Sequence, residues 1–314
     1  MNDGSPAPVL VPQVFRFNDI DAFRSSIRNL NVEFTPLAQK ISAEQIILNL
    51  PGCDLNFTKS FPRIIDGQLA PNCTAVGFSM DDGVPMRFNG VERDRSTIVI
   101  GRGGAAYSAV ERTARQYSSI IFSPEVEDRG WPETGLNFKI FETSEAAQLA
   151  LRELVHMVLS VSPQLAAASG LLGAAESIKE SLLSAIDRAF ADVVDAKWAS
   201  RANSTRQFKV FRDVQAVLSS DVGHPIYSGE IARQIGVSVR SMHDAVQRYR
   251  GMSLHRYLRL RRLWLVRQQL LAGTQSIKAC ALAFGFWHLG DFSRIYRAQF
   301  GESPSETAAR SRGA

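Results

Sequence analysis

Apolar and polar positions change their spacing along the 314-residue chain, and the first part shows the pattern of short strands. Up to about residue 141, short apolar runs recur between turn-forming dipeptides, which is typical of a sandwich or barrel. One early helix is predicted, with Asn18 or Asp19 as its cap and Phe23 on its apolar side. The predicted strands include Gln45–Leu50, Ala75–Met80, Thr97–Ile100 and Ser118–Phe122, and the predicted turns are Pro51-Gly52, Asp66-Gly67, Asp82-Gly83, Asn89-Gly90 and Gly103-Gly104.

Between about residues 143 and 194 the apolar spacing becomes three and four, which predicts two amphipathic helices. Such helices either cover an open face of the preceding β domain or form the seam of a homodimer, and the pattern alone leaves both open. The first helix carries Ala147, Leu151, Leu154, Val155 and Leu159 on its apolar stripe, and the candidate dimerisation residues on the second are Ile178, Leu182, Ile186 and Phe190.

The last third of the chain contains two helix-turn-helix patterns joined by an arginine-rich helix, predicted from about Leu254 to Leu271. In the first pattern, Gly236 supplies the tight turn and Ser238 caps a recognition helix that ends at Arg250. In the second, Gly285 is the turn glycine and the recognition helix covers about 290–300. One such pattern is a weak signal, but two in tandem indicate a protein that inserts recognition helices into successive major grooves.

The outward faces of these helices carry side chains that bind DNA bases and phosphates. Arg pairs with guanine, His and Gln with purine acceptors and Asp with the cytosine amino group. Asp244 has a second interpretation, as the helical partner of Arg240 or Arg248. The candidate base contacts are Arg240, His243, Asp244, Gln247 and Arg294, and the candidate phosphate contacts are Arg248, Arg256, Arg261, Arg262 and Arg297.

The charge distribution supports DNA as the partner. Residues 201–314 carry 18 Lys and Arg against 7 Asp and Glu, whereas residues 1–200 carry 18 against 24. A basic charge concentrated in one part of a chain indicates a domain that binds a polyanion. We therefore expect double-stranded DNA to bind the C-terminal part alone.

Composition and motifs argue against a membrane protein and against an enzyme. With 45% apolar and 21% charged residues and no long apolar run, we expect a globular cytoplasmic protein without a secretory signal or membrane partner. Three widely spaced cysteines are typical of reduced thiols. All five histidines lie after residue 155, so the β domain lacks the ligands of a metal cupin. We expect no catalytic residue, no metal and no cofactor.

Five C-terminal segments form a specific combination: Leu254–Leu258, Arg261–Leu263, Ala281–Phe286, Phe292–Arg294 and Phe300–Pro304. With them, about residues 207–312 resemble the AraC/XylS family of bacterial transcription regulators. The resemblance implies a seven-helix DNA-binding domain, control of promoters by activation through RNA polymerase, and a cupin-like N-terminal barrel that binds an effector or dimerises. By family position, Leu289 and Gly290 also face DNA.

Together these observations predict an α+β chain of two domains. A cupin-like β-barrel or jelly roll (1–142) precedes a helical segment (143–195), a linker (196–206) and an all-α domain with two helix-turn-helix motifs (207–314). The N-terminal domain is expected either to sense a small-molecule effector or to serve only as a dimerisation or protein-docking module. Weak candidates for an anionic effector are Arg24, Arg28, Arg93, Arg95, Arg112 and Arg115.

Overall fold

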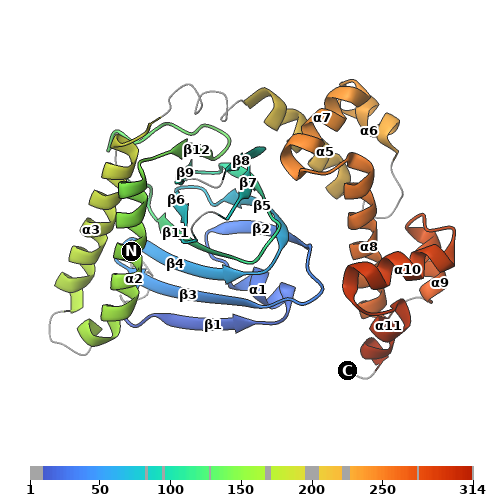
Figure 1. Ribbon diagram of the computed structural model, residues 1–314, viewed down its shortest axis with the longest axis horizontal. Coiled ribbons are helices and arrows are strands. Elements are labelled where there is room, and N and C mark those ends of the chain that lie inside the picture. Colours follow the sequence, from blue (N-terminus) through green and yellow to red (C-terminus); the bar gives the residue numbers. More distant parts are fainter. Residues whose placement is uncertain are drawn as a thin grey trace, which may run out of the picture. The chain divides into compact units, whose positions relative to one another are not determined.

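The chain forms two compact units, each with its own apolar core. A computed structural model describes residues 10–81, 84–93, 96–126, 129–166, 171–194, 205–220, 227–273 and 276–312. One unit comprises residues up to 34 and 41–203, and the other comprises 35–40 and 204–314 (Figure 1). Most of the predicted linker, 196–206, lies outside the described residues, so the four predicted domain boundaries stay a prediction.

Antiparallel strands form two sheets in the N-terminal unit. The larger sheet has the order β1-β3-β4-β11-β6-β9-β12 and the smaller one the order β2-β5-β10-β7-β8. Their ladders do not join into a closed barrel within the described residues, so the cupin-like barrel is not confirmed. The strands are β1 (Gln13–Phe17), β2 (Leu30–Pro36), β3 (Ala43–Leu50), β4 (Cys53–Ser60), β5 (Arg63–Leu69), β6 (Thr74–Ser79), β7 (Met86–Phe88), β8 (Val91–Arg93), β9 (Thr97–Arg102), β10 (Ala106–Glu111), β11 (Arg115–Phe122) and β12 (Lys139–Glu142).

The larger sheet is buried on both faces, which explains its continuous apolar runs. Along β9, Ile98 and Ile100 belong to the core shared with the helices, whereas Val99 belongs to the core shared with the smaller sheet. On β11, Ile120 and Ile121 divide in the same way. Because successive side chains of a strand point to opposite faces, β9 and β11 contribute to both cores. The unit therefore has three layers: helices, the larger sheet and the smaller sheet.

Two long helices, α2 (Glu145–Ala166) and α3 (Leu171–Ala191), lie side by side and cover the outer face of the larger sheet (Figure 1). The residues considered for a dimer seam are used inside this single chain. Leu182 and Ile186 are fully buried, Ile178 is nearly so, and Phe190 packs at the edge of the same core. The alternative that these four side chains form a dimer interface is therefore not supported by this structure. They already pack on the larger sheet of the same chain.

The short helix α1 (Ile20–Ser26) begins where the sequence predicts. Asp19 caps it by accepting a hydrogen bond from the Ala22 amide at 2.8 Å, and Phe23 is buried. The Asn89-Gly90 turn joins β7 to β8, with positive φ at both residues, as a tight hairpin requires. Asp82-Gly83 lies outside the described residues.

The predicted turn at Asp66-Gly67 is wrong, because both residues lie inside β5 and pair with β10. Gly67 is needed for packing and not for a turn, because it leaves room for an aromatic ring. The Tyr107 ring lies across Gly67, and a Cβ added there would come within 2.2 Å of the ring. Tyr107 itself stacks on Phe88, with the ring centroids 5.4 Å apart.

Gly67→Ala is therefore expected to lower the free energy of unfolding by about 1–3 kcal/mol, the usual cost of overpacking. The Tyr107 ring has little room to retreat, since Phe88 and Phe138 both pack against it. Urea unfolding measures the change. Gly173→Ala in α3 is the matched control, because a Cβ there meets no heavy atom within 4 Å. The control should leave stability unchanged or raise it by up to about 1 kcal/mol. Equal stability of both variants would contradict the packing argument.

The C-terminal unit consists of helices arranged around α8. The first half of α8 packs on the first helix-turn-helix, where the Tyr257 hydroxyl donates to Gln215 at 2.8 Å. Its second half contributes Leu263, Val266 and Leu270 to the core of the second. None of the described helices combines the length and apolar character needed to span a bilayer. The helices are α5 (Thr205–Ser220), α6 (Ser228–Gln234), α7 (Val239–Arg250), α8 (Leu254–Ala272), α9 (Ile277–Ala283), α10 (Leu289–Phe300) and α11 (Pro304–Arg312).

Candidate nucleic-acid interface and inter-sheet cavity

The two helix-turn-helix units close their turns with the same backbone geometry. Gly236 follows α6 and Gly285 follows α9, with φ of 69° and 77°. In both units the amide after the glycine donates back to the last turn of the preceding helix: Val237 to the Ala232 carbonyl at 3.0 Å, and Phe286 to the Ala281 carbonyl at 2.9 Å. A residue with a Cβ is strained at positive φ, so glycine suits both positions. The sequence pattern therefore located both turns correctly.

The first recognition helix, α7, has the bounds that the sequence predicts. Ser238 accepts from the Ser241 amide at 3.1 Å, as an N-cap does. Tyr227 occupies the N-cap position of the preceding helix, α6, and makes no side-chain cap. The buried face of α7 includes Met242, Ala245 and Tyr249. The candidate base contacts Arg240, His243, Asp244 and Gln247 are all exposed.

The second recognition helix, α10, buries Phe292, Tyr296 and Phe300. The opposite face exposes Leu289, Gly290 and Arg294 near its N-terminus. The Arg294 guanidinium lies 3.0 Å from the Asp291 carboxylate, one turn earlier on the same face. Trp287, just before α10, has 68% of its surface exposed. This end of α10 therefore presents a cation and two apolar side chains to solvent.

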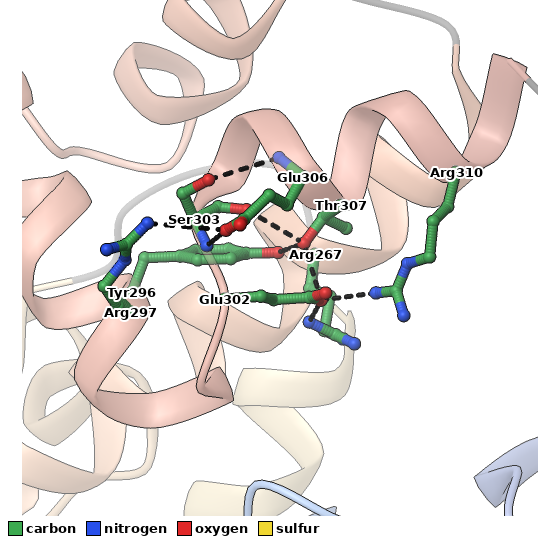
Figure 2. Close-up of polar contacts among 8 residues, drawn as sticks. All are labelled: Arg267, Tyr296, Arg297, Glu302, Ser303, Glu306, Thr307 and Arg310. Atoms are coloured by element: carbon green, nitrogen blue, oxygen red, sulfur yellow. Dashed lines mark hydrogen bonds and ion pairs between the residues drawn. The ribbon is translucent and has the colours of Figure 1, made fainter.

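A polar network ties α10 and α11 to α8 (Figure 2). The Tyr296 hydroxyl donates to Thr307 Oγ1 at 2.9 Å, and Thr307 donates to Glu302 Oε1 at 2.8 Å. The same oxygen accepts hydrogen bonds from Arg267 and Arg310. Each partner comes from a different helix or a different turn of α11, so Glu302 fixes how the recognition helix packs on α8.

A capping box begins α11 beside this network (Figure 2). Ser303 Oγ accepts from the Glu306 amide at 3.2 Å, and the Glu306 carboxylate accepts from the Ser303 amide at 2.6 Å. These hydrogen bonds from Ser303, with the Arg297 guanidinium 3.5 Å away, hold the pKa of Glu306 below its usual value. Arg297, a candidate phosphate contact, is exposed at this position.

The remaining phosphate candidates differ in their surroundings. Arg256 is exposed on α8, and Arg248 bonds to Gln207. Arg261 donates to the Leu218 carbonyl at 3.2 Å, so it also closes the end of α5. Arg262 is half-buried over the Phe286 ring, with 5.4 Å between guanidinium and ring centre, and burial lowers its pKa. Arg261 and Arg262 therefore have packing roles that the charge pattern did not indicate.

The N-terminal unit contains a partly open cavity of about 110 Å³ between its two sheets. Most of its wall is apolar, with Val32, Phe34, Ile65 and Phe88 among the lining residues. Of the weak effector candidates, only Arg28 is among the lining residues. Arg24 pairs with Asp21 on the surface, Arg112 is exposed, and Arg115 donates to Ser79 at 2.6 Å. The side chain of Arg93 and all of Arg95 lie outside the described residues.

Arg63 is the cavity residue that sequence reasoning missed. It lies on β5 with its side chain only 7% exposed, and its Nε donates to Glu111 Oε2 at 3.1 Å. The guanidinium carbon lies 4.6 Å from the centre of the Phe34 ring. Its Nη1 is buried and has no hydrogen-bond partner. Nothing local in the sequence marks this arginine, because its carboxylate partner is 48 residues away.

The cysteines and histidines do not assemble into a reactive centre. Cys53, Cys73 and Cys280 are free and buried, and burial raises the pKa of Cys53 to about 12, which disfavours the reactive thiolate. Among the described residues, no three His, Cys, Asp or Glu side chains are placed to hold a metal ion.

The family model matches a segment of the C-terminal unit. Residues 231–310 match the model of a helix-turn-helix domain. A XylDLEGF operon transcriptional activator of Pseudomonas putida is 31% identical over 103 residues, which is 32% of this chain and 31% of the relative. A probable thc operon regulatory protein of Rhodococcus erythropolis is 34% identical over 92 residues, or 28% of each chain. This chain thus spans about a third of the length of these relatives.

A solved structure gives the same result at the level of sequence. A probable AraC family transcriptional regulator from Rhodopseudomonas palustris is 35% identical, and the alignment covers 33% of this chain and 97% of that chain, with a TM-score of 0.30. The family model covers both recognition helices described above. The chain belongs to the AraC/XylS family of transcription regulators.

Proposed function

We propose that this protein is a sequence-specific regulator of transcription whose C-terminal unit binds two successive major grooves and whose N-terminal unit responds to a small molecule. The observation that carries the proposal is the pair of exposed recognition faces, on α7 and α10, in a domain of this family. Activation, as in the matched XylDLEGF activators, is the proposed output. RNA polymerase and a second copy of the chain are proposed partners.

The two recognition helices are proposed to read bases by different means. On α7, Arg240, His243 and Gln247 offer hydrogen bonds to base edges, and Asp244 suits a cytosine amino group. On α10, Leu289 suits a thymine methyl group, and Gly290 has no neighbouring heavy atom where a Cβ would lie, so DNA can approach closely. Arg294 is then the main hydrogen-bonding side chain of the second helix. Phosphate contacts are proposed for Arg248, Arg256 and Arg297, with Arg261 and Arg262 at the edge of the interface.

Arg294→Ala is expected to weaken specific binding by about 1–3 kcal/mol and to relax the preference at one base step. The reason is that Arg294 is exposed near the start of α10, held only by the solvent-exposed pair with Asp291. Selection from a random DNA library, followed by competition binding on the selected sequence, measures both effects. Arg233→Ala on the supporting helix α6 is the matched control, because this arginine is also exposed. An unchanged base preference would remove Arg294 from the base-reading residues.

For the N-terminal unit we propose a jelly roll of the cupin type that holds an effector between its sheets. The cavity between the sheets supports this proposal, since ligand sites are concave and mostly apolar with a few polar groups. A thermal-shift screen of the full chain against sugars, amines, aromatic acids and cyclic nucleotides tests it. A ligand that binds the folded state raises the melting temperature by mass action. No saturable shift across such a panel would contradict it.

A second candidate function is a dimerisation or protein-docking module without an effector. One observation favours it: Leu149, Met157 and Val161 are exposed along one side of α2. Exposed apolar groups gathered on one face mark interaction sites. The screen above separates the two candidates, because a docking module should show no saturable ligand shift.

A further inference from the structure

Arg63 on β5 is one of the residues that line the cavity between the sheets, and it has a buried hydrogen-bond donor that lacks an acceptor. Its guanidinium is surrounded by the rings of Phe23, Phe34 and Phe61 at 5.0, 4.6 and 5.5 Å. Nε is used by Glu111, whereas Nη1 is buried without a partner. An unsatisfied donor on a buried charged group is costly, and native structures rarely leave one unexplained. An acceptor supplied by a ligand would satisfy it.

The charges that line the cavity favour a ligand with one negative charge. Among the lining residues, the charged ones are Arg28, Arg63 and Glu111, which together carry one net positive charge. Glu111 is fixed by two donors, since Ser60 Oγ also bonds to its Oε2 at 3.0 Å. It therefore neutralises one edge of the Arg63 guanidinium and leaves another edge for a second carboxylate. A guanidinium has five N–H donors, enough for both.

The remaining polar groups are neutral donors and acceptors. Burial raises the pKa of both Tyr107 and Tyr117, so their hydroxyls stay protonated near neutral pH. The Tyr117 ring lies across Gly77, where an added Cβ would come within 2.3 Å of its hydroxyl oxygen. These tyrosines thus form part of the cavity wall and offer O–H groups to an anion without adding negative charge.

The size of the cavity limits the rest of the ligand. Its volume of about 110 Å³ is comparable to the ~150 Å³ cavity that holds one benzene molecule in an engineered protein core. The apolar wall, which includes Ile65, Val99 and Phe138, suits a single ring or a short branched chain rather than a sugar.

We propose that the effector is a small organic monocarboxylate with a compact apolar body, and that its carboxylate accepts a hydrogen bond from Arg63 Nη1. This proposal rests on the proposed effector function of the N-terminal unit and names its ligand class. Arg28, exposed at the cavity, supplies the second positive charge.

Matched pairs of probes test the charge requirement on the full chain. Benzoate is compared with benzyl alcohol, and cyclohexanecarboxylate with cyclohexylmethanol, by thermal shift and isothermal titration calorimetry. Each carboxylate should bind at least about tenfold more tightly than its alcohol, the effect expected of a charge-assisted hydrogen bond. Equal or tighter binding of the alcohols would overturn the monocarboxylate assignment and leave the effector function intact. Binding of none of the four probes would overturn the assignment too, whereas the broader screen decides the effector function itself.

Two variants assign the preference to Arg63. The double variant Arg63→Met/Glu111→Gln removes both members of the buried pair, so no unpaired charge remains, and it should bind acid and alcohol equally. Arg63→Lys keeps the charge beside Glu111 but has a single nitrogen, so it should lose at least about threefold in carboxylate affinity with no change for the alcohols. Arg24→Met is the control, because Arg24 pairs with Asp21 outside the cavity. If both variants fold by circular dichroism and keep the wild-type preference, Arg63 does not bind the carboxylate. If only Arg63→Lys folds, its ratio of carboxylate to alcohol affinity decides whether Arg63 binds the carboxylate: an unchanged ratio excludes Arg63.

Discussion

Leu182→Ala is expected to lower the free energy of unfolding by about 2–5 kcal/mol, the range found when a fully buried leucine leaves a cavity. Leu182 lies on α3 and is completely buried in the core that α2 and α3 share with the larger sheet. The surrounding strands cannot collapse into the gap, because their ladders fix the spacing of the sheet. Urea unfolding followed by far-ultraviolet circular dichroism measures the loss.

Leu149→Ala on α2 is the control for this prediction. The same atoms are removed, but Leu149 is 53% exposed and lies outside that core, so the change should stay within about 0.5 kcal/mol. If Leu182 instead faced a partner chain, its replacement would leave the monomer stable and shift the oligomeric state in sedimentation. That result would restore the dimer-seam interpretation of α3.

Glu302→Ala should destabilise the C-terminal unit by about 2–3 kcal/mol and weaken DNA binding as a consequence. One carboxylate oxygen accepts from Arg267, Thr307 and Arg310, and Arg267 is itself largely buried, with a side-chain exposure of 17%. Removing the carboxylate leaves that guanidinium without its acceptor, which costs more than the loss of an exposed ion pair. Thermal unfolding, with binding to a selected DNA sequence, measures both effects.

Ser305→Ala provides the comparison for Glu302, because Ser305 is exposed on the first turn of α11. It should change stability by less than about 0.5 kcal/mol. Wild-type stability of the Glu302 variant would mean that the network in Figure 2 does not hold α11 in place.

The helix-turn-helix units were predictable because their signals are local. A glycine at positive φ, a serine cap two residues later and an apolar face at helical spacing all lie within about twenty residues of one another. Gly236, Ser238 and Met242 therefore specify α7 without knowledge of the rest of the chain. The second unit has the glycine and the apolar face, in Gly285 and Phe292, but its N-cap residue His288 makes no side-chain cap.

The N-terminal unit was harder to predict because its determinants are distant in sequence. Gly67 resembles a turn glycine until Tyr107, from another strand, is placed on it. Ile186 and its neighbours form an apolar stripe whether the covering surface is a sheet or a second chain. Arg63 is held in the cavity wall by Glu111 and by three aromatic rings, all of which lie outside β5. Composition and periodicity carry no information about such pairings.

The helix α8 sets the distance and the rotation between the two recognition helices, α7 and α10. Its first half belongs to one core and its second half to the other, and no loop interrupts its 19 residues. One residue inserted near its middle would turn the second helix-turn-helix by about 100° and advance it by about 1.5 Å relative to the first. The two helices would then no longer fit one face of a duplex. In the proposed binding mode, the length of α8 therefore sets the spacing of the two DNA half-sites.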